Sequence, residues 1–136
     1  MALDFGSKRI GVAVADPTET YALPVGTIER TSLHADIEHL KAYVKEYSVG
    51  EIVVGDPLTL SGERSFASKQ VDEFVGMLER IFPGAIHRID ERMTTAQATK
   101  AMISAGLSRK QRRRAVDKTA AALILETFLI KRRHRA

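Results

Sequence analysis

The order of strand-type and helix-type segments constrains the fold of this chain more than any other feature of its sequence. Three strand-type segments come first, and helical and strand-type spacing alternate after them. The expected strands are 2–4, 9–15, 22–29, 51–55 and 85–89, and the expected helices are 33–47, 67–81, 94–106 and 108–131. This order predicts an α/β fold with a mixed sheet flanked by helices.

Two of the strand-type segments carry further information about their place in the sheet. The run Glu51 to Gly55 is short, apolar and bounded by turn residues, which favours a buried parallel strand. Pro24 lies inside the segment 22–29, and proline is tolerated in a strand only at a sheet edge or a bulge. We therefore expect 22–29 at an edge or at a bulge.

Length and composition exclude several classes of protein. With 136 residues, the chain is expected to form a single domain over 1–136. It contains no cysteine, which excludes disulfide scaffolds, thiolate metal sites and cysteine nucleophiles. The longest apolar stretch, 120–125, is far shorter than the ~20 residues of a membrane-spanning helix, and the N-terminus lacks an export signal. We therefore expect a cytoplasmic protein with no membrane partner.

Acidic residues follow two of the expected strands. Asp4 ends the first strand and precedes a turn, where it either caps the turn backbone or binds a cation. Asp90 and Glu91 follow the last strand, at the end of the sheet where open α/β folds bind ligands. Neighbouring strand residues point to opposite faces, so only one of this pair can aim at a common site. The alternative is a plain ion pair with Arg92.

A further acid, Asp117, lies inside the expected last helix. The helix places it on the same face as its apolar residues Ala120, Ala121, Ile124 and Phe128. Asp is unfavourable in the middle of a helix. Either the helix places this carboxylate close to the sheet as a functional acid, or Asp117 pairs with Arg113 or Arg114. Together, these acids form a set of oxygen ligands suited to Mg²⁺ or Mn²⁺ and hence to phosphodiester hydrolysis.

Four ordered motifs resemble the YqgF family, also called the RuvX or Holliday-junction-resolvase family. They are Leu3 to Asp16, Val53 to Pro57, Asp90 to Thr95 and Val116 to Ala121, and they span nearly the whole chain. The resemblance implies an RNase H-like fold with a five-stranded mixed sheet. It also implies divalent-metal-dependent nuclease activity, associated with 5′-end maturation of precursor 16S rRNA in ribosome biogenesis or with four-way DNA junctions.

Carried over residue by residue, the resemblance places the catalytic acids at Asp4, Glu91 and Asp117, with Asp90 as the second choice within its pair. The metal ligands would be Asp4, Glu91 and Asp117. Asp56 departs from the family pattern, which usually has an apolar residue there, so it is either an extra acid near the site or a loop cap. Thr94 and Thr95 fit helix capping better than catalysis.

Several cations lie beside these acids in the sequence. Lys8 and Arg9 follow Asp4, and Arg92 follows Glu91, so they are candidates for holding phosphates; solvated surface charges are the alternative for Lys8 and Arg9. Residues 107–136 carry a net charge of +8, against −4 for the rest. Five of these charges precede Asp117 as Arg109, Lys110, Arg112, Arg113 and Arg114. We expect nucleic acid to bind there.

Four functions remain open from the sequence. The first is a nuclease that trims precursor 16S rRNA, and the second is a resolvase of branched DNA, which needs two coordinated sites and hence a dimer. The third is an RNA-binding module without catalysis, whose signature would be a lost acid. The fourth, an actin- or sugar-kinase-like ATPase, needs a second large domain that 136 residues do not supply. We expect a monomer or a weak homodimer.

Overall fold

Five strands form one mixed sheet in the computed structural model, which describes residues 1–57, 61–91, 106 and 108–135, with the backbone alone over 109–119 and at Arg135. The strands are β1 (Ala2–Phe5), β2 (Arg9–Ala15), β3 (Ala22–Glu29), β4 (Glu51–Asp56) and β5 (Ala85–Asp90). Their order is β3-β2-β1-β4-β5. β1 to β3 pair antiparallel, whereas β4 is parallel to both β1 and β5. The predicted α/β fold with a five-stranded mixed sheet is confirmed.

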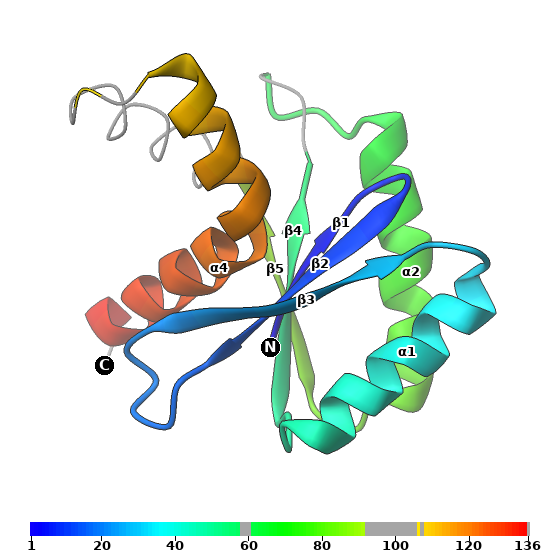
Figure 1. Cartoon of the computed structure of the whole chain (residues 1–136). Coiled ribbons are helices and arrows are strands. Elements are labelled where there is room, and N and C mark those ends of the chain that lie inside the picture. The colour runs from blue at the N-terminus through cyan, green and yellow to red at the C-terminus, as the bar shows by residue number, and fades with distance from the viewer. Residues whose placement is uncertain (58–60, 92–105, 107, 136) are drawn as a thin grey trace.

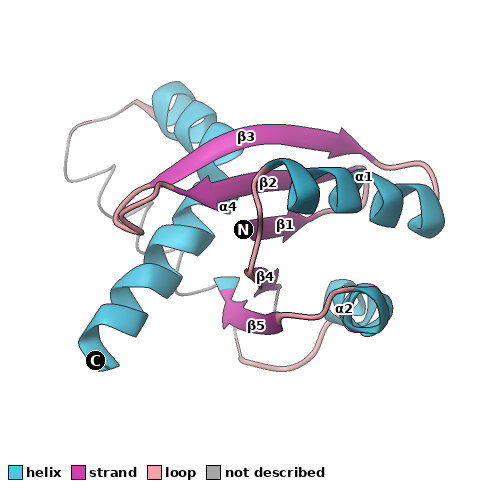
Figure 2. Cartoon of the chain, turned by 90° about the horizontal axis from the view of Figure 1, so that it is seen from below, coloured by secondary structure: helices cyan, strands magenta, loops and turns pink. Residues whose placement is uncertain are grey.

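Helices cover both faces of this sheet. α1 (Leu33–Glu46) and α2 (Phe66–Ile81) lie on one face, and α4 (Arg109–Arg135) lies on the other (Figures 1 and 2). Side chains of β1, β2 and β4 pack against side chains of α1 and α2, among them Leu40 and Phe74. A second cluster, which includes Ala121 and Ile124, packs α4 against the sheet. The molecule therefore has three layers, and α4 alone among the described helices covers the second face.

Most of the predicted elements are present within one or two residues of the expected bounds. Ser32 caps α1, with its side chain accepting a hydrogen bond from the Ala35 N–H at 3.1 Å. The predicted helix 94–106 falls on residues outside the described part of the chain, apart from Gly106. α4 continues to Arg135, beyond the predicted end at Lys131, because basic residues are favourable in the last turn of a helix. No described helix is both long and apolar enough to cross a membrane.

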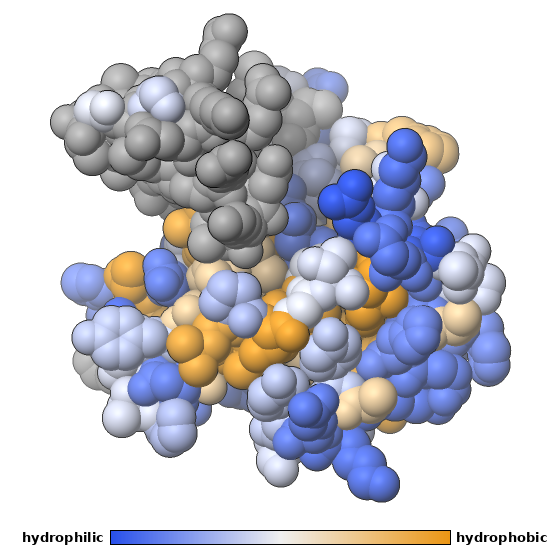
Figure 3. All heavy atoms as spheres, viewed as in Figure 1, coloured by the Kyte–Doolittle hydropathy of each residue, from blue (hydrophilic) through white to orange (hydrophobic). Residues whose placement is uncertain are grey.

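Strand β3 lies at one edge of the sheet, as Pro24 predicts. The pairing of β2 with β3 shifts register between Val12 and Ala13, which pair with Gly26 and Pro24, so Pro24 also lies next to a bulge at Val25. In the view of Figure 3, apolar side chains gather across the middle of the molecule, along the course of β3. Leu23 on this strand is 49% exposed. Pro24 removes one N–H donor from the row along this edge, which limits pairing with another strand.

The alternation of side chains along β1 determines where the acids lie. Leu3 and Phe5 pack toward α1 and α2, whereas Ala2 packs toward α4. Asp4 therefore points to the α4 face, near the end of the strand. The parallel strands β4 and β5 end at the same edge of the sheet as β1. Asp4, Asp56 and Asp90 therefore all lie near this edge.

Candidate active site

Asp4 and Glu91 come from different strands and meet at the edge of the sheet where β1, β4 and β5 end. Asp4 is the third residue of β1, and Glu91 directly follows β5. Their side chains are hydrogen bonded to each other, and both are largely buried. Two carboxyl groups in direct contact repel each other when both are ionised, so one of them tends to keep its proton. The structure therefore brings together two of the four acids predicted from the sequence.

The protonation of this pair follows from its surroundings. Burial raises the pKa of the Asp4 carboxyl above its usual value. Burial and the neighbouring negative charge of Asp4 together raise the pKa of Glu91 to about 8. At neutral pH, Glu91 therefore keeps its proton and donates it to Asp4. Perturbed carboxyl groups of this kind are typical of functional sites.

Two glycines leave room for the pair beneath α4. Gly11 on β2 lies opposite Asp4 in the register of β1 and β2. A β-carbon added at Gly11 would lie 3.6 Å from the β-carbons of both Asp4 and Ala121, so α4 approaches the sheet beside Asp4. A β-carbon added at Gly55 would lie 2.4 Å from Glu91 Oε1 and 2.8 Å from Glu91 Cγ. Glu91 therefore occupies space that only a glycine at position 55 leaves open.

We expect Gly55→Ala to displace Glu91 and to impair both stability and activity. The added methyl group would also lie 2.8 Å from Ile124 Cδ1, so both the acid and the end of this side chain would have to shift. Overpacking of this kind destabilises a protein by about 1–3 kcal/mol. Denaturant unfolding measures the stability change, and the rate of cleavage measures the effect on the acid.

Gly76→Ala is the matched control for this substitution. Gly76 lies in α2, is exposed, and has no atom within 4 Å of an added β-carbon. Alanine in a helix interior is more stable than glycine by roughly 0.5–1 kcal/mol, so this variant should gain stability and keep its activity. Equal effects of the two substitutions would contradict the steric role of Gly55.

Asp90 lies apart from the pair of Asp4 and Glu91. It pairs with Asp56 across β4 and β5, and the alternation along β5 places it on the sheet face opposite Ile89, which packs toward α4. Asp56 lies on the α2 side as well and is 8% exposed. The two acids therefore do not join Asp4 and Glu91 on the α4 face, although their charges contribute to the raised pKa of Glu91.

A four-residue ion-pair cluster surrounds Asp56. Its Oδ2 accepts hydrogen bonds from Arg64 Nη1 at 3.3 Å and pairs with Arg88 Nη2 at 3.2 Å. Both arginines also bind Asp72 on α2. Asp56 Oδ1 is buried and has no hydrogen-bond partner among the described residues. The cluster ties α2 and the segment before it to the ends of β4 and β5.

Asp117 lies in α4, and its side chain is outside the described residues. Position 117 precedes Ala121 by four residues and Ile124 by seven, so the helix places these three positions on one face of the backbone. Ala121 and Ile124 lie beside Gly11 and Gly55 respectively. The backbone of α4 at position 117 is therefore about one turn away from Ala121, which lies beside Gly11.

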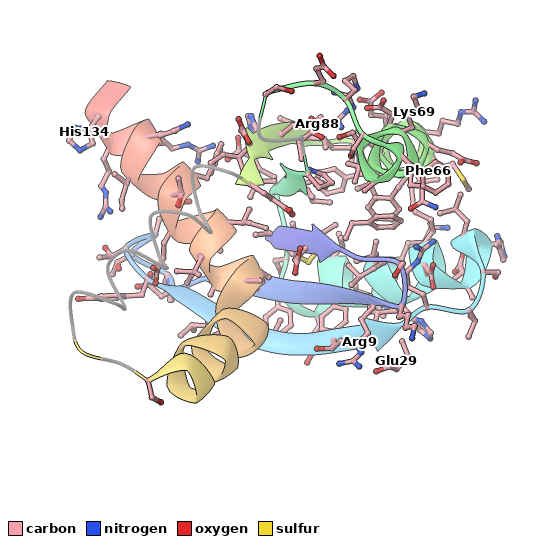
Figure 4. All side chains as sticks on the ribbon, turned by 90° about the horizontal axis from the view of Figure 1, so that it is seen from above. Arg9, Glu29, Phe66, Lys69, Arg88 and His134 are labelled. Atoms are coloured by element: carbon pink, nitrogen blue, oxygen red, sulfur yellow. The ribbon has the colours of Figure 1, made fainter. Side chains whose placement is uncertain are left out.

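Among the cations predicted to bind nucleic acid, two have described side chains. Lys8 and Arg9 are exposed in and just after the turn that follows Asp4. Arg9 Nε lies 3.7 Å from Glu29 Oε1. Seen from above, Arg9 at the start of β2 and Arg88 on β5 lie on opposite sides of β1 (Figure 4). Arg92 and the side chains of Arg109, Lys110, Arg112, Arg113 and Arg114 lie outside the described residues.

The chemistry of Asp4 and Glu91 fits a divalent cation. Both offer carboxylate oxygens, the ligands that Mg²⁺ and Mn²⁺ prefer, and a cation would offset the burial and the repulsion from Asp4 that raise the pKa of Glu91. Within the side chains that the structure describes, no group of three or more His, Cys, Asp or Glu residues is suitably placed to bind a metal ion. The backbone at position 117 lies on α4, the helix whose Ala121 and Ile124 lie beside Gly11 and Gly55.

Sequence reasoning missed two groups of ion-paired residues near the ends of the strands. The first comprises Arg64, Asp72 and Arg88, which hold Asp56; their spacing gives no signal, because the three come from different elements. The second is the ion pair of Arg30 with Asp36, whose Nε to Oδ2 distance is 3.0 Å. Asp36 is 0% exposed and lies one residue before Ile37 of the buried face of α1, which is the signal that could have revealed it.

Comparisons with known proteins agree on one family. The model of the RuvX family, described as Holliday junction resolvase, matches residues 1–131. A protein of Maridesulfovibrio salexigens is 39% identical over 129 residues, which cover 95% of this chain and 96% of that protein. One of Heliobacterium modesticaldum is 40% identical over 136 residues, which cover all of this chain and 91% of its own length. Both are named "Putative pre-16S rRNA nuclease".

A comparison with solved structures finds the resolvase of Fowlpox virus in complex with its substrate, Holliday junction DNA. The sequence identity is 9%, the TM-score is 0.42, and the match covers 93% of this chain and 90% of that chain.

Proposed function

The chain belongs to the RuvX family, and we propose that it is a divalent-metal-dependent nuclease that acts on structured nucleic acid, with precursor 16S rRNA as its substrate. The reaction is the hydrolysis of a phosphodiester bond during maturation of the 5′ end of that RNA. Relatives at 39–40% identity over nearly the whole chain carry the corresponding name.

The observation that carries this proposal is the contact between Asp4 and Glu91 at the end of the sheet. Two partly buried carboxyl groups in direct contact destabilise a fold unless a bound group offsets their repulsion, and burial and this repulsion raise the pKa of Glu91 to about 8. No apolar packing requirement explains such a pair. A site that binds a cation does explain it, because a cation turns the repulsion into attraction.

The proposed residues divide into those that would bind the metal ion and those that would bind phosphates. Asp4 and Glu91 would hold the metal ion together with Asp117 of α4. When bound, Mg²⁺ or Mn²⁺ supplies charge to stabilise the phosphate and lowers the pKa of bound water. Lys8 and Arg9, exposed just past Asp4, would hold the phosphates beside the scissile bond. Asp90 lies on the other face, which supports Glu91 as the ligand of the two.

Cleavage of a four-way DNA junction is the second candidate, because the matching family model is described as a resolvase. The two candidates differ in substrate and in assembly. A junction resolvase must make two coordinated cuts and therefore acts as a dimer, whereas trimming of a precursor RNA needs one site.

The two substrates can be compared directly with purified protein. We expect Mg²⁺ or Mn²⁺ to support cleavage of an RNA that carries the 5′ leader of precursor 16S rRNA, and a chelator to abolish it. A synthetic four-way DNA junction of equal length serves as the competing substrate. Faster cleavage of the junction, by a protein that is dimeric in solution, would favour the second candidate. Binding of the RNA with no cleavage under any metal would overturn the nuclease and favour an RNA-binding module.

A further inference from the structure

The turn that follows Asp4 is held by an arginine from another part of the chain. Gly6 N–H donates a hydrogen bond to the Arg9 carbonyl at 2.9 Å, which closes the turn between β1 and β2. Arg30, just after β3, reaches this turn at two points. Its backbone N–H donates to the Lys8 carbonyl at 2.9 Å, and its Nη1 donates to the Gly6 carbonyl at 3.0 Å. The backbone on both sides of Ser7 is thereby fixed to Arg30.

The guanidinium group of Arg30 is itself fixed on two further sides. Its Nε donates to Asp36 Oδ2 at 3.0 Å. Its carbon Cζ lies 4.2 Å above the centre of the Phe5 ring, and that ring stacks on Phe74 with 4.5 Å between ring centres. The planar group can therefore bridge a carboxylate, an aromatic face and a carbonyl at once. Lysine has no planar fork with which to do the same.

Among the described residues, Arg30 is the cation that pairs with the carboxylate of Asp36. It lies in the first turn of α1 and is 0% exposed. Its Oδ1 accepts a hydrogen bond from the Thr31 N–H at 3.3 Å. A buried carboxylate is unfavourable unless it is paired and hydrogen bonded, and the pair here connects the start of α1 to the turn beside Asp4. An apolar pair at these positions would fill the same space without reaching the Gly6 carbonyl.

We propose that Arg30 and Asp36 are positioning residues for the turn that carries Lys8, and that they fix Lys8 beside Asp4 for contact with a phosphate of the substrate. The inference rests on the proposed function, because it assigns a purpose to Lys8 in binding nucleic acid. It adds two residues that do not touch the substrate. They act by limiting the motion of residues 6–8 relative to Asp4.

The plain alternative is that the ion pair contributes only to stability. Replacing one partner cannot separate the two roles, because it leaves a buried charge without its partner and destabilises the protein in either case. The double variant Arg30→Met, Asp36→Leu avoids this, because replacing both partners of a buried pair by apolar residues is often neutral for stability. Arg30→Lys is the second variant, and it keeps the charge next to Asp36 without the fork.

The test is a double-mutant cycle with Lys8→Gln, read out by binding of a fluorescent RNA duplex with a single-stranded 5′ extension in the presence of a chelator. In the wild-type background, Lys8→Gln should weaken binding about tenfold and reduce the slope of log affinity against log salt by about 0.7–0.9. In the double-variant or the Arg30→Lys background, Lys8→Gln should change neither quantity. Amide hydrogen exchange at Gly6 should be at least about tenfold faster in both backgrounds.

Additive effects of Lys8→Gln in the two backgrounds, with unchanged exchange at Gly6, would overturn the positioning role. Failure of the wild type to bind the RNA would instead overturn the proposed function, and the exchange measurement would then decide on its own whether Arg30 fixes the turn. Arg80→Gln, at the far end of α2, is the control for the removal of a charge remote from the site.

Discussion

Asp4→Asn is expected to abolish cleavage while leaving the fold and nucleic-acid binding intact. The substitution keeps the size of the side chain and removes one of the three carboxylates that would hold the metal ion. Loss of a residue that only orients a metal ligand costs about 10–100-fold, so loss of a ligand should reduce the rate by at least about 100-fold. Binding measured with a chelator should be unchanged or tighter, because one negative charge near the phosphates disappears.

Asp16→Asn is the matched control for this variant. Asp16 follows β2 at the other end of the sheet, is partly exposed, and accepts hydrogen bonds from the N–H groups of Thr20 and Tyr21 at 2.8 and 2.6 Å. Asparagine keeps an oxygen that can accept these bonds, so cleavage should remain at the wild-type rate. Equal cleavage by Asp4→Asn and wild type would exclude Asp4 from the reaction.

Much of the fold could be predicted because its elements have strong local signals. Alternating apolar residues predict β2, the bounded apolar run predicts β4, and Ser32 marks the start of α1 within a residue. Pro24 indicated an edge or a bulge, and the structure has both. The end of α4 was placed too early, because a run of basic residues resembles a solvated tail in sequence, whereas at a helix C-terminus it prolongs the helix.

The candidate site was predictable where it depends on strand periodicity and unpredictable where it depends on tertiary contacts. Period-two alternation separates Asp90 from Glu91, and the structure shows Glu91 in contact with Asp4. Nothing local indicates that Gly55 makes room for Glu91, because the contact joins residues 36 positions apart. The same holds for Arg30 and the Gly6 carbonyl, 24 positions apart. Such contacts arise only once the sheet has formed.

Glu91→Gln is expected to raise the stability of the metal-free protein at neutral and alkaline pH. The pKa of Glu91 is raised from 4.5 to about 8 in the folded protein, so folding retains a proton that the unfolded chain has lost. The stability associated with this group is complete below pH 4.5 and is lost as the pH rises to about 8. At pH 7, the cost to the wild type is on the order of 3 kcal/mol. Glutamine mimics the protonated acid and can donate to Asp4, so it removes the cost.

Thermal unfolding at several pH values measures this effect. Between pH 7 and pH 8 the melting temperature of Glu91→Gln should exceed that of the wild type by roughly 10 °C, and the two should converge near pH 4.5. Glu38→Gln is the control of opposite sign, because Lys41 at 3.0 Å lowers the pKa of Glu38. Removal of the Glu38 carboxylate should therefore lower the stability slightly above pH 4.5. A Glu91→Gln variant that is no more stable than the wild type at pH 8 would contradict the raised pKa.

The metal ion should cancel the advantage of Glu91→Gln. A cation that binds the folded wild type releases the proton of Glu91 and stabilises the fold in proportion to its concentration above Kd. Glutamine is a neutral and weaker ligand, so millimolar Mn²⁺ should raise the melting temperature of the wild type and leave that of the variant nearly unchanged. The difference between the two proteins at pH 8 should therefore shrink as Mn²⁺ is added. A difference in melting temperature that stays constant as Mn²⁺ is added would mean that Glu91 is protonated for a reason other than metal binding.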